Sequence, residues 1–330
     1  MSETRERINF KAETAGYRAG EILEQGERAV VEGVFEHAVY LKGAGDTLVK
    51  LITDKDYIGP ASIAVFSDAH TDFKSAGIRE GEEIAASPEA LRAVSGGFAV
   101  DLSEAGVWNA PPAPEERLGL EEMNLNMRVL RDVIYTHPSR EGLVPLLESV
   151  ELMGPMEVFL KEQKPSVSER ARPYIERLMW GLFSGDLNGA AENAGHILGL
   201  GPGLTPSCDD FLAGLIFGLK RGIGLLFSEK DRALPGFIDK FSEEIIKRAK
   251  DKTTIYSVSY LTEAARGEAP APAWELVYAI VSKNPDDVAA VSRKLVKMGE
   301  TSGSDTAVGI YYGIRFLISR IELEEIDETA

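Results

Sequence analysis

A proline-rich stretch at residues 109–117, NAPPAPEER, separates two parts of the chain with different hydrophobic patterns. Before it, short apolar runs are separated by glycine-containing turns such as residues 43–46, a pattern typical of strands in a small sheet or barrel. After it, apolar residues recur at helical spacing. Proline-rich segments of this kind join domains. The sequence therefore predicts an α+β protein, with a β-rich N-terminal domain over residues 1–112 and a mainly α-helical domain over residues 113–330.

The composition excludes several classes of protein. A single cysteine rules out an internal disulfide, and four scattered histidines argue against a histidine-based zinc site. A net charge of −17 disfavours binding to nucleic acid. No signal-like segment and no run of about 20 apolar residues is present, so we expect a cytoplasmic protein without a membrane contact.

An internal repeat is the most informative feature of the helical part. An ungapped alignment pairs Ser207 with Ser302, Asp210 with Asp305, Gly214 with Gly309 and Gly218 with Gly313. Serine followed three residues later by aspartate resembles a capping box at the start of a helix. Glycine at every fourth position costs ~1 kcal/mol against alanine, which close helix contact would offset. We therefore predict that the two helices pack together, about a pseudo-twofold axis.

The loop before the first repeat predicts a binding site. It holds three glycines and two prolines in residues 199–207, and such loops bind anions through backbone amides at a helix N-terminus. Capping and helix packing explain the same residues without any ligand, so both interpretations stay open. The residues predicted to bind a small anionic substrate are Gly201, Gly203, Thr205, Ser207, Thr254, Ser257, Ser302 and Asp305.

Two adjacent acids in the first repeat, Asp209 and Asp210, are the candidate catalytic residues. They would repel an anion unless a magnesium ion bridged them to it, so they are also the candidate metal ligands. No other cofactor is suggested. We interpret Asp210 as the structural member, because the repeat conserves it as Asp305, and Asp209 as the chemical group. The neighbouring Cys208 is a weaker candidate nucleophile, because Gly303 replaces it in the second repeat.

The motif at residues 199–214, GLGPGLTPSCDDFLAG, resembles a bacterial family that includes the small subunit of the oxamate carbamoyltransferase complex of allantoin degradation. The resemblance spans about residues 50–320 and extends to Thr-Thr-x-x-Ser at 253–257 and Ser-Gly-x-Asp at 302–305. Cys208 departs from the family pattern, which has glycine there. The resemblance implies a subunit of a carbamoyltransferase-type complex of purine catabolism and nitrogen metabolism, which binds an anionic acyl-phosphate-like ligand and acts with partner subunits.

Two other functions remain open from the sequence. Residues 302–306, SGSDT, are loosely similar to a motif of helical ADP-ribosyl hydrolases, which would make the chain a stand-alone magnesium-dependent hydrolase. Alternatively, the glycines at every fourth position serve helix packing alone, and the chain is a non-catalytic scaffold or sensor subunit.

Overall fold

The computed structural model describes residues 8–24, 28–43, 48–67, 72–137, 141–147, 165–227 and 233–329. The chain divides into two compact units. The first comprises Met1–Pro111 together with Glu268–Ala271, and the second comprises Pro112–Gly267 and Pro272–Ala330. The short return of residues 268–271 to the first unit has no counterpart in the hydrophobic pattern.

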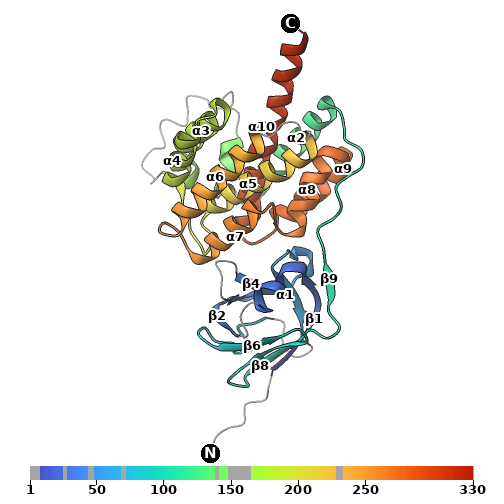
Figure 1. The fold of residues 1–330 in the computed structure, drawn as a ribbon, viewed down its shortest axis with the longest axis vertical. Helices are drawn as coiled ribbons and strands as arrows, with labels where there is room; N and C mark the ends of the chain where they lie inside the picture. Colours follow the sequence, from blue (N-terminus) through green and yellow to red (C-terminus); the bar gives the residue numbers. More distant parts are fainter. Residues whose placement is uncertain are drawn as a thin grey trace, which may run out of the picture. The chain divides into compact units, whose positions relative to one another are not determined.

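The first unit is a β-barrel, which confirms the predicted β-rich N-terminal part (Figure 1). Its sheet runs in the order β5-β4-β3-β2-β6-β7-β8-β1, and the pairing of β5 with β1 closes it. A further strand, β9, pairs with the end of β1. The strands are β1 (Ile8–Gly16), β2 (Arg28–Val34), β3 (Ala38–Lys42), β4 (Leu48–Ile52), β5 (Ser62–Phe66), β6 (Glu83–Ser87), β7 (Ala90–Ala93), β8 (Phe98–Asp101) and β9 (Gly106–Trp108).

Alternating burial along the strands fills the barrel. In β2 every second residue is buried, which follows from the two-residue period of a strand. Phe10 and Phe73 meet in the barrel core with ring centroids 5.4 Å apart. The predicted turn at residues 43–46 lies mostly outside the described residues. One helix in this unit, α1 (Tyr17–Glu24), was not predicted.

The second unit is helical, as predicted (Figure 1). Residues Val144–Leu147 form a short 3-10 helix, η2. The helices are α2 (Leu120–Tyr135), α3 (Val167–Ser184), α4 (Leu187–Ile197), α5 (Ser207–Leu226), α6 (Ala233–Ala249), α7 (Ile255–Ala265), α8 (Ala271–Ser282), α9 (Pro285–Val296) and α10 (Ser302–Thr329). None of the described helices is long and apolar enough to cross a membrane.

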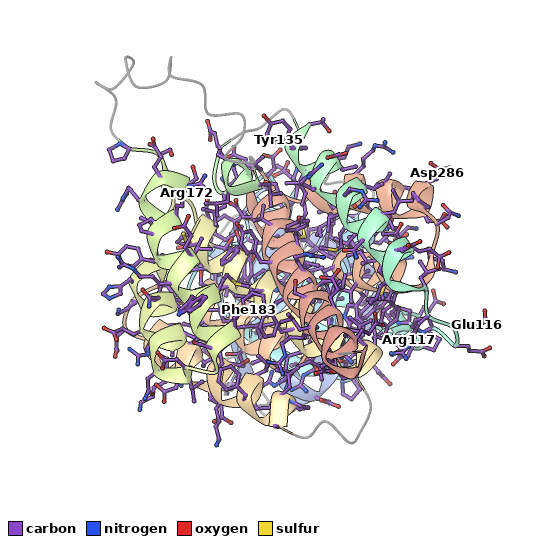
Figure 2. All side chains as sticks on the ribbon, turned by 90° about the horizontal axis from the view of Figure 1, so that it is seen from above. Glu116, Arg117, Tyr135, Arg172, Phe183 and Asp286 are labelled. Atoms are coloured by element: carbon purple, nitrogen blue, oxygen red, sulfur yellow. The ribbon has the colours of Figure 1, made fainter. Side chains whose placement is uncertain are left out.

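Helix α5 forms the centre of this unit, and most of its residues are buried. Its last turn leaves carbonyl groups without partners inside the helix, and Arg117 donates hydrogen bonds to two of them, those of Leu225 and Leu226 (Figure 2). Helix α10 is flanked by α3, where Phe183 meets Phe316 with ring centroids 4.9 Å apart (Figure 2). The two repeats thus begin the two long helices of the core.

The glycines of the repeat hold α5 and α10 in direct backbone contact. A Cβ atom on Gly214 would come within 2.1 Å of the Thr306 carbonyl oxygen, and one on Gly309 within 2.1 Å of the Phe211 carbonyl oxygen. Thr306 and Phe211 are themselves equivalent in the repeat, so the two contacts are reciprocal. The predicted packing of the two helices about a pseudo-twofold relation is therefore confirmed.

Candidate functional site

The glycine loop before α5 is shaped by left-handed backbone. Gly199, Gly201 and Gly203 have φ values of 76°, 131° and 93°, which favour glycine. A Cβ atom on Gly201 would lie 2.5 Å from the Ser207 nitrogen, whereas one on Gly203 would meet nothing within 4 Å. Gly201 therefore packs the loop on the start of α5, and Gly203 faces open space.

The amides at the start of α5 already have acceptors. Cys208 donates its N–H to the Leu200 carbonyl at 3.0 Å. Asp209 and Asp210 both donate to the Pro206 carbonyl, at 2.8 and 3.2 Å. These three N–H groups are thus directed at the protein itself. The geometry gives little support to a phosphate held by the first turn of this helix.

The predicted capping box does not form at the start of α5. The N-cap residue of α5 is Pro206, which makes no side-chain cap bond. Instead the serine and aspartate of the repeat pair across the two helices, because the glycines bring the helix starts close together. Ser302 lies beside Asp210 and Ser207 beside Asp305, and each hydroxyl lowers the pKa of that carboxyl group.

Asp209 has both carboxylate oxygens engaged by the protein. Its Oδ1 accepts the N–H of Gly199 at 2.8 Å, and its Oδ2 accepts the hydroxyl of Thr253. Ser257 also lies close enough to lower the pKa of Asp209. Asp209 therefore ties the glycine loop to the start of α7, which is a structural role.

Asp210 and Asp305 each use one oxygen for the protein and leave the other without a partner. Oδ2 of Asp210 accepts the Thr205 hydroxyl at 3.1 Å, and Oδ1 of Asp305 accepts the Leu143 N–H at 2.7 Å. Among the described residues, Asp210 Oδ1, Asp305 Oδ2 and the nearby Ser207 Oγ are buried without a hydrogen-bond partner. The roles predicted from the sequence, with Asp209 as the chemical group and Asp210 as the structural one, stay a prediction.

Burial dominates the ionisation of the acids. It raises the pKa of Asp305 to about 7, and the Leu143 amide and the nearby Ser207 and Thr301 hydroxyl groups lower it only in part. Burial also raises the pKa of Asp210 well above its ordinary value, and the charge of Asp305 raises it further. The pKa of Asp209 is raised by burial as well.

A partly exposed rim of hydroxyl groups adjoins the buried acids. Thr205 contacts Ser302 at 3.2 Å between hydroxyl oxygens, and both residues contact Asp210. Thr254 caps α7, where its hydroxyl accepts the Ser257 N–H at 3.1 Å and donates to the Leu204 carbonyl at 2.5 Å. The structure therefore brings most of the sequence-predicted residues into one cluster, whereas Gly203 faces open space and Thr254 caps α7.

Two residues of the cluster were missed by the sequence. Gly142 has a φ of 69°, and a Cβ atom there would lie 2.4 Å from Asp305 Oδ1. Leu143, beside it, binds Asp305 through its backbone amide, which no side-chain pattern reveals. The left-handed glycine is the only feature that could have indicated this contact.

The contacts described here do not support Cys208 as a nucleophile, and they do not support a metal site. Burial and the charges of Asp305 and Asp209 raise the pKa of the Cys208 thiol far above its usual range, so the nucleophilic thiolate is suppressed. The described residues contain no group of three or more acid, histidine or cysteine side chains placed to hold a metal ion. Magnesium at Asp209 and Asp210 stays a prediction.

The cluster is a buried polar site beside partly exposed hydroxyl groups. Two cavities formed by described residues, of about 330 and 360 Å³, lie elsewhere. The first is an apolar cavity between η2, α3 and α10, and the second is formed by the barrel loops around Arg79 and Gly96.

Two family models match the chain. One, described as oxamate carbamoyltransferase subunit AllH, matches residues 197–314, and the other, described as the AllH family N-terminal domain, matches residues 10–107. Together these ranges cover more than half of the 330 residues. The chain belongs to the AllH family. No solved structure matches it.

The AllH matches divide along the two units. The N-terminal model covers the barrel strands from Phe10 onward, and the AllH model begins at the last residue of α4 and ends inside α10. Every residue predicted for the site falls inside the AllH match. Gly142 and Leu143 lie outside both matches, so the backbone that holds Asp305 comes from a segment that neither AllH model includes.

Proposed function

We propose that the chain is a subunit of a carbamoyltransferase-type complex that acts on oxamate or a related small carboxylate bearing an amide. The observation that carries the proposal is the match of both AllH models, one to each unit. The description of the AllH family as an oxamate carbamoyltransferase subunit supports a role with partner subunits in allantoin degradation.

The site within this subunit is the cluster of Asp210, Asp305 and the hydroxyl groups around them. Buried polar atoms without partners are uncommon in folded proteins, and each costs about 1–3 kcal/mol. Their concentration at the start of α5 and α10 supports binding of a small polar ligand there. The engaged amides of α5 favour the amide-bearing carboxylate over an acyl phosphate as the molecule that this cluster takes.

The test is reconstitution of carbamoyl transfer. The chain is purified together with the candidate partner subunits encoded beside it, and carbamoyl transfer to oxamate is measured with and without the chain. We expect activity only when the chain is present. A strong loss on Asp210→Asn in a complex that still assembles places the cluster in that activity.

A complex that transfers carbamoyl groups equally well without the chain would contradict the proposal. Full activity of the Asp210→Asn complex would instead leave the chain with a scaffold role. Thr262→Ala is the control for assembly, because Thr262 binds only the Val258 carbonyl within its own helix.

A further inference from the structure

Helix α3 carries an exposed tryptophan beside the apolar cavity. Trp180 is 74% exposed, the largest fraction among the large apolar side chains that the structure describes. Phe183, three residues further along the same helix, is 38% exposed and packs its ring on Phe316 of α10 (Figure 2). Exposed aromatic side chains that lie together in this way mark a surface that binds another protein.

The cavity has room for a large side chain. It measures about 330 Å³, and its apolar lining includes Met179 and Phe183 from α3, Phe316 from α10 and Leu146 from η2. An apolar cavity of ~150 Å³ can hold benzene, so this cavity can hold an indole ring. Trp180 does not line it, because Trp180 lies about 100° around the helix from Met179. The indole of the same chain therefore does not fill the cavity.

The charges around this surface are of both signs. Glu176 and Arg177 are exposed one turn before Trp180 on α3, and Arg315, at the cavity, pairs with Glu322 at 3.1 Å. The whole chain carries a net charge of −17, so two copies repel each other over much of their surface. A surface of balanced charge lets a second copy approach, whereas a basic partner would favour an acidic surface.

We propose that this surface of α3 and α10 binds a second copy of the chain, with the Trp180 indole of each copy in the cavity of the other. An indole and a cavity beside each other on one helix form a self-complementary surface. A twofold axis between them brings each indole onto the partner's cavity. The inference goes beyond the proposed function, which concerns the cluster at the starts of α5 and α10.

The first experiment measures the oligomeric state of the purified full-length chain. Sedimentation equilibrium from about 1 to 100 µM is expected to show a monomer–dimer equilibrium. A central interface tryptophan contributes a factor of about 30 in affinity, and the dimer holds two, so Trp180→Ala should weaken association about a hundredfold or more. Phe66→Ala is the matched control, because Phe66 is a 44% exposed aromatic residue of the barrel, and it should keep the wild-type dissociation constant.

The second experiment fills the cavity and leaves the indole in place. In Met179→Trp the larger side chain occupies the cavity, so this variant alone should also associate weakly. A mixture of Trp180→Ala and Met179→Trp chains restores one of the two contacts, because one copy supplies the cavity and the other supplies the indole. The mixed pair is therefore expected to bind about tenfold or more tightly than either variant binds itself.

The outcomes decide the identity of the bound chain. A wild-type chain that stays monomeric over the whole range would overturn the inference, as would a dimer that Trp180→Ala leaves unchanged. A mixed pair that binds no better than the separate variants would show that Trp180 does not enter the cavity. If wild type alone is monomeric and Trp180→Ala instead loses the partner subunits of the reconstituted complex, the surface belongs to a partner subunit and the inference is wrong.

Discussion

The starts of α5 and α10 are built from the same repeat but are positioned in different ways. Both carry the serine and aspartate of the cluster, and both carry glycines that contact the partner helix. Helix α5 follows a loop with three left-handed glycines, whereas the first turn of α10 lies directly against the end of α9. A Cβ atom on Gly303 would come within 2.0 Å of the Leu295 carbonyl oxygen.

The equivalent position in α5 accommodates the side chain of Cys208, so the two starts are not equally crowded. The shared residues lie where the helices touch, and the differing residues lie where each helix meets its own surroundings. Asp209 has Ser304 as its counterpart, which fits a role in holding the loop of α5 alone. Residues that are the same in both repeats therefore form the pair of acids. Residues that differ between the repeats hold each helix start in its own surroundings.

The largest expected effect tests the contact that makes the repeat symmetric. In Gly309→Ala the added methyl group meets the backbone of α5, so the free energy of unfolding is expected to fall by about 3 kcal/mol. Gly224→Ala on α5 is the control, because a Cβ atom there meets nothing within 4 Å. It should raise the free energy of unfolding by ~1 kcal/mol. Urea denaturation measures the free energy of unfolding of both variants. Equal changes in the two variants would contradict the close contact at Gly309.

A smaller effect is expected at the segment that holds Asp305 but has no counterpart at Asp210. Gly142→Ala adds a methyl group against Asp305 at a left-handed position, with an expected loss of about 2 kcal/mol. Gly185→Ala, with a φ of 74° and no neighbour within 4 Å, should lose only the backbone strain of about 1 kcal/mol. A loss at Gly142 no greater than at Gly185, in the same urea titrations, would contradict the contact.

The pH dependence of stability probes the burial of Asp305. Its pKa is raised from an ordinary 3.8 to about 7, so the folded protein keeps a proton that the unfolded chain releases. The stabilisation is full below about pH 4 and is lost as the pH rises to 7. The free energy of unfolding of wild type minus that of Asp305→Asn should therefore decrease between pH 4 and 7 and level off above. A difference that increases with pH would show a lowered pKa instead.

The smallest effect concerns the glycine loop that only α5 has. Thr254→Ala removes the N-cap of α7 and the bond to Leu204, with an expected cost of about 1 kcal/mol. Thr262→Ala in the same helix removes one bond to a helix carbonyl and should cost less. Thermal unfolding of the two variants gives the comparison, which fails if Thr262→Ala is the more destabilising.

Much of the fold followed from the sequence because it depends on local patterns. The two-residue and 3.6-residue periods separated the barrel from the helices, and the spacing of Gly214 and Gly309 predicted a close helix contact. The return of residues 268–271 to the barrel unit depends on tertiary contacts, which such patterns do not encode.

The sequence predicted most residues of the polar cluster but not how they pair. The sequence placed Ser207 and Asp210 in one capping box, because a serine and an aspartate three residues apart fit that local motif. The structure pairs each with the other helix, and this crossing follows only from the backbone contact at the glycines. The hydrogen bond from Leu143 to Asp305 could not be predicted for another reason. Its donor is a backbone amide, which every residue except proline carries.

A double-mutant cycle on Asp210 and Asp305 tests the central claim, that these two acids act as one unit across the helix contact. The free energies of unfolding of the wild type, Asp210→Asn, Asp305→Asn and the double variant are measured at pH 8 in urea. The account predicts that the two substitutions depart from additivity by 0.5 kcal/mol or more, an order-of-magnitude threshold for coupled neighbours. Additivity within about 0.3 kcal/mol would show two independent residues and contradict it.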